Sequence, residues 1–127
     1  MSLPTDRRYS TTHEWYKLEG DVVTMGITQF AADELTDITY VELPKEGSRV
    51  EAGQACGELE SVKATSDLYS AVSGEVVARN ADLSDHPEKI NEDAFNAGWM
   101  LKIRVKDRAP LDALMDAKAY ETQIAAQ

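Results

Sequence analysis

The sequence has few of the residues that disulfide, metal or nucleophilic chemistry requires. Cys56 is the single cysteine, so an internal disulfide cannot form, which is typical of a reducing compartment. The two histidines, His13 and His86, lie far apart, and neither has metal-ligand spacing around it. Residues for a Ser-His-Asp or Cys-His site cannot be assembled. That the chain is an enzyme with its own active site is therefore only an alternative hypothesis.

Positive charge and long apolar runs are scarce as well. Thirteen Lys and Arg residues against 23 Asp and Glu residues give a net charge of −10. Such a surface repels phosphate backbones and anionic lipid, so we expect neither nucleic-acid nor membrane binding. No apolar run is long enough to cross a bilayer, and the N-terminal MSLPTDRRYS has no apolar core for a signal peptide. We therefore expect a cytoplasmic protein with a single domain over residues 1–127.

Short strands and turn residues occupy much of the chain. Residues 12–27 alternate around Glu19-Gly20-Asp21, which predicts a hairpin. The period then changes to that of a helix over 27–35, with Thr28 as its cap. Residues 38–43 predict a strand that Pro44 stops, and residues 99–105 form the clearest strand pattern.

The second half of the chain adds helical segments. The polar connection over 78–98 is too long to be structureless, and we expect a helical turn near Leu83–Ile90. Pro110 opens a predicted C-terminal helix over about 110–120, with an apolar stripe at Leu111, Leu114 and Met115. Many short strands with a few short helices indicate a small β-barrel or sandwich.

Lys63 stands alone as a cation within GELESVKATSDLYSAVSGEVV, residues 57–77. It lies near the midpoint between the turn residues Gly53 and Gly74, which predicts two antiparallel strands with Lys63 at the reversal. An exposed lysine is usually no more than surface charge. An attachment lysine, however, needs small neighbours that admit a modifying enzyme, and Val62 and Ala64 meet this requirement.

The segment Thr12-His13-Glu14 contains acid and base residue types. Neighbouring residues on a strand point to opposite faces, so we expect that His13 and Glu14 do not serve one site together. A structural or surface role is the expectation for His13.

Four co-linear blocks resemble the H proteins of the glycine cleavage system. They are THEWY, GITQFAADELTDITYVELPKEGSRVEAG, ESVKATSDLYSAVSGEVV and NEDAFNAGWMLKIRV, and the resemblance extends from about Tyr9 to Tyr120. The chain departs from the family at Ala71, where proline is usual, and in the DAFNAGW loop. The resemblance implies a mainly β barrel-sandwich hybrid, with a lipoyl-binding core over about 22–104, short helices and a C-terminal helix.

The same resemblance implies a carrier without catalysis of its own. Lipoic acid would be attached to Lys63 by an amide bond, through a lipoate-attaching enzyme. The arm would carry the aminomethyl group of glycine from the pyridoxal-phosphate-dependent glycine decarboxylase (P protein) to the aminomethyltransferase (T protein). Dihydrolipoyl dehydrogenase (L protein) would then reoxidise the arm. The free protein is expected to be a monomer.

The amine on such a loaded arm is cationic at neutral pH, and sheltering it without an acceptor would be costly. Glu14 and Asp67 are the candidate carboxylates, and Thr12 is a candidate hydroxyl partner on the same side as Glu14. Plain surface charge is the competing interpretation for both acids.

Three related kinds of carrier are alternatives to this interpretation. A biotin carrier usually has methionines around its lysine, and this chain has Val62 and Ala64 there. A lipoyl domain of a 2-oxoacid dehydrogenase is usually followed by linkers and further domains. The strongest alternative is an H-like lipoyl reservoir or relay that serves protein lipoylation or another lipoate-dependent system. Neighbouring genes for the decarboxylase and the aminomethyltransferase would favour the glycine cleavage reading.

Overall fold

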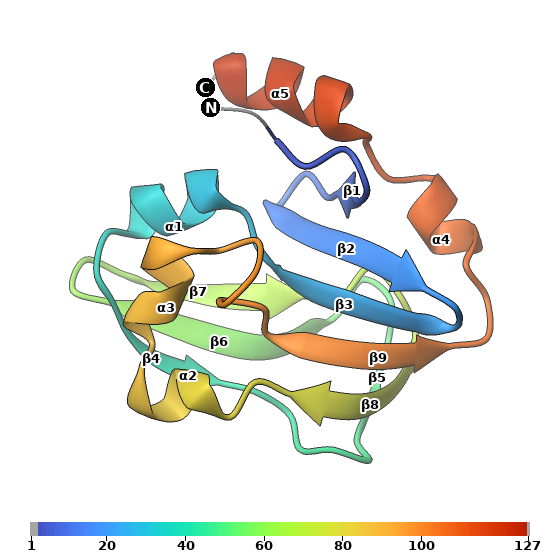
Figure 1. The fold of residues 1–127 in the computed structure, drawn as a ribbon, viewed down its shortest axis with the longest axis horizontal. Coiled ribbons are helices and arrows are strands. Elements are labelled where there is room, and N and C mark those ends of the chain that lie inside the picture. The colour runs from blue at the N-terminus through green and yellow to red at the C-terminus, as the bar shows by residue number, and fades with distance from the viewer. Residues whose placement is uncertain (1–2, 127) are drawn as a thin grey trace.

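A computed structural model describes residues 3–126 (Figure 1). The strands are β1 (Arg8–Tyr9), β2 (Glu14–Glu19), β3 (Val22–Ile27), β4 (Ile38–Glu42), β5 (Arg49–Val50), β6 (Ala55–Ser61), β7 (Thr65–Tyr69), β8 (Gly74–Arg79) and β9 (Leu101–Val105). The helices are α1 (Gln29–Leu35), α2 (Asp82–Asp85), α3 (Glu88–Glu92), α4 (Ala109–Asp112) and α5 (Ala117–Ala125).

Two antiparallel sheets form the body of the protein. One sheet has six strands in the order β1-β2-β3-β9-β8-β5, and the other has three in the order β4-β6-β7. The apolar core joins them, since Met25 and Ile103 of the larger sheet and Leu59 and Leu68 of the smaller one belong to one buried cluster. The helices α1, α2 and α3 lie together at one end, and α4 and α5 lie on the other side of β1 and β2 (Figure 1). The mainly β prediction with short helices is confirmed.

The local predictions for the first half of the chain are also confirmed. Strands β2 and β3 pair from Glu14↔Ile27 to Glu19↔Val22, and Gly20 takes the positive φ of 63° that their turn requires. The side chain of Thr28 caps α1 by accepting the N–H of Ala31 at 3.2 Å. These features depend on residues close in sequence, which explains why the pattern was informative.

The prediction of one C-terminal helix over 110–120 is wrong. The segment forms α4 and α5, and between them Met115 pairs with Tyr9 through two backbone hydrogen bonds of 2.8 and 3.0 Å. Asp116 then begins α5 by accepting the N–H of Ala119 at 2.9 Å. The pairing with β1 thus takes Met115 out of the helical period that its apolar stripe had suggested.

The polar connection after β8 contains two short helices, α2 and α3, instead of one helical turn. Pro87 lies between them, where its missing N–H and fixed φ allow α3 to begin. Strand β1 was not anticipated, because two residues carry no readable alternation. Among residues 3–126, no helix is both long and apolar enough to span a bilayer.

Candidate functional site

The turn between β6 and β7 presents Lys63 to solvent. Ser61 organises this turn, because its hydroxyl oxygen accepts the N–H of Lys63 at 3.2 Å and that of Ala64 at 3.0 Å. The Ser61 N–H in turn donates to the carbonyl of Ala64 at 2.8 Å. Val62 is 69% exposed, and Ala64 is exposed as well. The predicted position of Lys63 at the reversal is therefore confirmed, and both flanking side chains leave it accessible.

The amine of Lys63 already points toward α1. Its Nζ donates a hydrogen bond of 3.0 Å to the backbone carbonyl of Glu34 in the last turn of that helix. Carbonyls at a helix C-terminus carry partial negative charge, which favours a cation there. The free lysine thus lies along the end of α1.

A cavity of about 230 Å³ opens beside the same turn of α1. The start of β2, the end of β3, α1 and β7 line it, with the residues Thr12, His13, Glu14, Ile27, Phe30, Ala31, Glu34, Leu35, Ser66 and Asp67. We call this cavity the arm pocket. It brings together all three residues that the sequence nominated as partners of a cationic arm, Thr12, Glu14 and Asp67.

Glu14 is the most unusual residue of the arm pocket, because it is a carboxylate that is only 1% exposed. Its Oε1 accepts the hydroxyls of Ser10, at 2.5 Å, and of Thr12, and its Oε2 accepts the N–H of Tyr69 at 3.1 Å. Burial raises the pKa of Glu14 above its usual value, and the three donors partly offset this effect. Within residues 3–126, no Lys, Arg or His forms an ion pair with it.

Asp67 and Thr12 lie in a wetter environment than Glu14. Both are exposed, and Asp67 accepts a long hydrogen bond of 3.4 Å from the hydroxyl of Tyr69. Glu14 also lines a second cavity of about 340 Å³, together with Tyr16, Tyr69 and Ala71 among others. Glu14 and Thr12 therefore both line two cavities.

The expectation that His13 and Glu14 cannot share a site is wrong. Both line the arm pocket, because His13 has a φ of 72° and lies in the turn before β2, where strand alternation does not apply. The Nδ1 of His13 is 2.7 Å from the hydroxyl of Tyr120 in α5. Its ring lies 5.1 Å from that of Phe30 in α1, and burial lowers its pKa.

Sequence reasoning missed three contributors to the pocket: Ser10, Phe30 and the backbone N–H of Tyr69. Ser10 bonds Glu14 from a turn whose shape depends on the unforeseen β1, and the donor at Tyr69 comes from a strand 55 residues away. No local pattern marks either contact.

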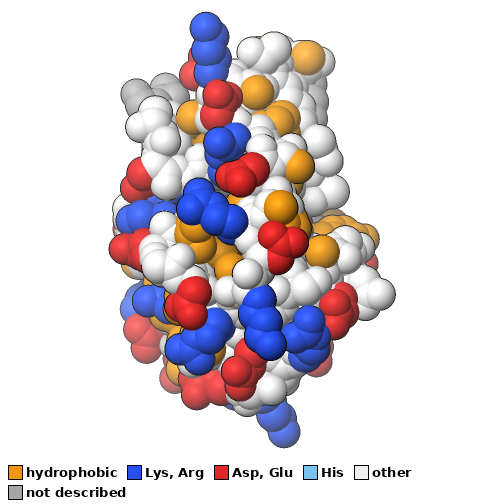
Figure 2. Space-filling view, turned by 90° about the vertical axis from the view of Figure 1, so that its right-hand side faces the viewer, with side chains coloured by type: hydrophobic (Ala, Val, Ile, Leu, Met, Phe, Trp, Pro, Cys, Tyr) orange, Lys and Arg blue, Asp and Glu red, His pale blue; other side chains and the backbone are white. Residues whose placement is uncertain are grey.

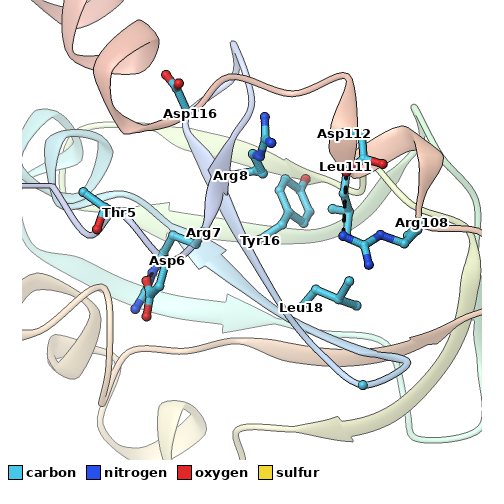
Figure 3. Close-up of a pocket in the computed structure, with 11 residues that line it drawn as sticks. Thr5, Asp6, Arg7, Arg8, Tyr16, Leu18, Arg108, Leu111, Asp112 and Asp116 are labelled. Atoms are coloured by element: carbon cyan, nitrogen blue, oxygen red, sulfur yellow. Dashed lines mark hydrogen bonds and ion pairs between the residues drawn. The ribbon is translucent and has the colours of Figure 1, made fainter.

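A larger cavity of about 660 Å³ lies elsewhere, between β1, β2 and α4 (Figure 3). Its charged side chains are engaged with one another or with the backbone: Asp6 with Arg7 at 2.9 Å, and Arg8 with the carbonyl of Leu114 at 3.1 Å. On the end of the molecule that carries α4, lysines and arginines are interspersed with acidic residues (Figure 2). Neither this cavity nor this surface carries an excess of one sign of charge, and neither includes Lys63.

Comparison with known proteins identifies the family. The family model described as "Glycine cleavage H-protein" matches residues 7–127. The chain belongs to this family. A glycine cleavage system H protein from Magnetococcus marinus is 48% identical over 120 residues, covering 94% of this chain and 86% of that protein. A probable glycine cleavage system H protein from Natronomonas pharaonis is 52% identical over 125 residues, covering 98% of each.

A solved structure agrees with the sequence relatives. The crystal structure of a glycine cleavage system H protein from Mycobacterium marinum superposes with a TM-score of 0.89 at 36% identity, covering 97% of this chain and 99% of that one. The two sheets, the short helices and the C-terminal helix are thus the arrangement of this family, and the predicted barrel-sandwich hybrid is confirmed.

Proposed function

We propose that this chain is the lipoyl carrier of the glycine cleavage system, with lipoic acid attached through an amide bond to Nζ of Lys63. One observation carries the proposal: an exposed turn lysine lies beside a pocket whose buried carboxylate, Glu14, has no ion-pair partner among residues 3–126. A lysine that served only solubility would need no buried carboxylate nearby. The family membership supports the same role.

The turn has the properties that attachment requires. The backbone around Lys63 is held by Ser61, so the lysine is presented in one conformation while its own side chain stays exposed. Val62 and Ala64 add no bulk or charge that would block a lipoate-attaching enzyme. That enzyme would itself bring the activated acyl group to the lysine amine.

The arm pocket has the properties that shelter requires. When bound, the lipoyl group supplies a disulfide that takes up the aminomethyl group of glycine and is later regenerated by oxidation. Glu14 would accept a hydrogen bond from the cationic amine, because its carboxylate is buried, oriented by three donors and free of an ion pair among the described residues. Asp67 would add a second negative charge at the edge, and Thr12 would hold Glu14 in place.

The remaining parts of the pocket would exclude water. Phe30, Ala31 and Leu35 of α1, together with Ile27 of β3, give the cavity an apolar lining. Water exclusion slows hydrolysis of a reactive group and strengthens the attraction between an ammonium and a carboxylate. The P, T and L proteins would each act on this chain as a common substrate. The chain would have no catalytic step of its own.

The test is reconstitution with the glycine decarboxylase. Protein from a lipoate-replete host is expected to show one lipoyl adduct, on the tryptic fragment containing Lys63, and to support release of carbon dioxide from glycine by the decarboxylase. Lys63→Arg keeps the charge but removes the acceptor amine, so it should fold normally and lose both the adduct and the activity.

An adduct on another lysine, or full activity of Lys63→Arg, would refute the assignment of the attachment site. Lipoylated protein that fails with the decarboxylase but donates its lipoyl group to other proteins would favour the reservoir or relay function instead.

A further inference from the structure

Tyr120 of the C-terminal helix α5 contacts His13, a residue that lines the arm pocket. Tyr120 is 0% exposed and stacks on Tyr9, with ring centroids 4.9 Å apart and an interplanar angle of 8°. Trp15 completes the buried aromatic cluster, which is separate from the core between the sheets. A second contact of α5, from Nε2 of Gln123 to the carbonyl of Thr11 at 3.1 Å, reaches the turn that precedes Thr12.

The hydroxyl of Tyr120 joins two walls of the arm pocket. On one side it is 2.7 Å from Nδ1 of His13, which lines the pocket at the start of β2. On the other side it is 2.7 Å from Oγ1 of Thr28. The same oxygen of Thr28 caps α1 by accepting the N–H of Ala31.

Helix α1 forms much of the pocket on the Thr28 side. Phe30, Ala31, Glu34 and Leu35 of this helix line the cavity, and the carbonyl of Glu34 receives the Nζ of Lys63. The ring of Phe30 also contacts that of His13, with centroids 5.1 Å apart. The position of α1 relative to β2 therefore determines the width of the pocket.

We propose that Tyr120 is a positioning residue for the arm pocket. Its hydroxyl holds His13 and the capped end of α1 at a fixed separation. The effect on a loaded arm rests on the proposed function. The positioning of His13 and α1 does not, because the unmodified chain already has this geometry. Helix α5 would thus be part of the functional site, although none of its residues lines the pocket.

Tyr9 provides a matched control. It is the stacking partner of Tyr120, is equally buried, and like Tyr120 has a pKa raised to about 12 by burial. Its hydroxyl, however, donates to the carbonyl of Pro4 at 2.5 Å, away from the pocket. Tyr9→Phe and Tyr120→Phe each remove one buried hydroxyl from the same stacked pair and keep both rings.

The first measurement uses the unlipoylated protein. In Tyr120→Phe, the ¹⁵N resonance of His13 Nδ1 should shift, because its hydrogen bond with the Tyr120 hydroxyl is lost. The amide of Ala31 should exchange with solvent about two- to tenfold faster, because Thr28, which caps it, loses one hydrogen bond of ordinary strength. Tyr9→Phe should leave both signals as in the wild type. His86 lies outside the pocket and serves as an internal reference.

The second measurement is the spontaneous decay of the loaded arm in the absence of the partner proteins. Tyr120→Phe should decay about two- to tenfold faster than wild type, and Tyr9→Phe should match wild type. Equal behaviour of the two variants in both measurements would overturn the positioning role. If the wild-type arm cannot be loaded, the proposed function fails, while the His13 and Ala31 signals still decide the role of Tyr120.

Discussion

The turn that carries Lys63 and the pocket beside it are held by contacts of different range. The turn depends on Ser61, two residues away, whereas the pocket combines Glu14, Asp67 and α1 and is braced by Tyr120, 107 residues from His13. The backbone of the turn is therefore held mainly by local hydrogen bonds, with one longer-range bond from the N–H of Val62 to the carbonyl of Asp37, whereas the shelter requires most of the fold. Substitutions should separate the two: changes in the turn should affect modification, and changes in the pocket should affect the loaded state or the fold.

The largest expected effect concerns Glu14 and the loaded arm. Replacing it with glutamine removes the charge that would receive the cationic amine, and a hydrogen bond to a charged group contributes about 1.5–3 kcal/mol. Glu14→Gln should therefore shorten the half-life of the loaded arm about ten- to a hundredfold, measured without the other three proteins. Asp67→Asn should have a smaller effect, because Asp67 is exposed. Equal half-lives for wild type, both variants and the double variant would leave apolar shielding as the sole protection.

When the arm is absent, Glu14→Gln should become more stable toward unfolding than wild type as pH rises. Burial raises the pKa of Glu14 in the folded state, so the folded protein binds this proton more tightly than the unfolded chain does. That contribution favours folding below the unfolded pKa of Glu14 and is lost as pH rises through the raised folded value. Urea unfolding between pH 4 and 7 should show Glu14→Gln gaining stability relative to wild type as pH rises. A constant difference across this range would contradict the raised pKa.

The next effect is on the fold, at the far end of α1. Asn91 holds the segment after this helix, since its Oδ1 accepts the N–H of Ile38 at 3.0 Å and its Nδ2 donates to the carbonyl of Thr36 at 2.7 Å. Thr36 has a φ of 61°, which is unfavourable for a β-branched residue and needs such support. Asn91→Ala should lower the free energy of unfolding by about 1–2 kcal/mol.

The control for this variant is Asn96→Ala, which removes a single exposed contact of 3.3 Å with Asp93 and should change stability by less than about 0.5 kcal/mol. The lipoylation rate of Lys63 should be the same in both variants, because the turn keeps its bonds to Ser61. A loss of lipoylation in Asn91→Ala would show that the turn depends on the pocket after all.

The same difference in range explains what could be predicted from sequence. Lys63 at a reversal, the Thr28 cap and the hairpin around Gly20 all follow from spacings of a few residues, and each is confirmed. The pocket was anticipated only as a set of residue types. Its geometry depends on the positive φ of His13 and on contacts that join β1 and α5 across the whole chain.

The error at the C-terminus has the same cause. An apolar stripe at Leu111, Leu114 and Met115 fits one helix, and nothing local indicates that Met115 will pair with Tyr9 instead. That pairing lets α5 begin at Asp116 and turn Tyr120 toward the pocket. The predicted single helix from Pro110 therefore gave no indication of the contact between Tyr120 and His13 on which the positioning role depends.

The smallest effect on stability is expected in the turn itself. Val62 is 69% exposed and contributes its backbone N–H, not its side chain, to the bond of 3.1 Å with the carbonyl of Asp37. Val62→Glu and Ala64→Trp should therefore change the free energy of unfolding by less than about 0.5 kcal/mol. Both should slow lipoylation several-fold, because they place charge or bulk beside the amine that the attaching enzyme must reach. Val62→Ala keeps a small neutral flank and should be modified at the wild-type rate. Wild-type rates for Val62→Glu and Ala64→Trp would mean that the enzyme reads the backbone of the turn, and the small flanks would then have no role in recognition.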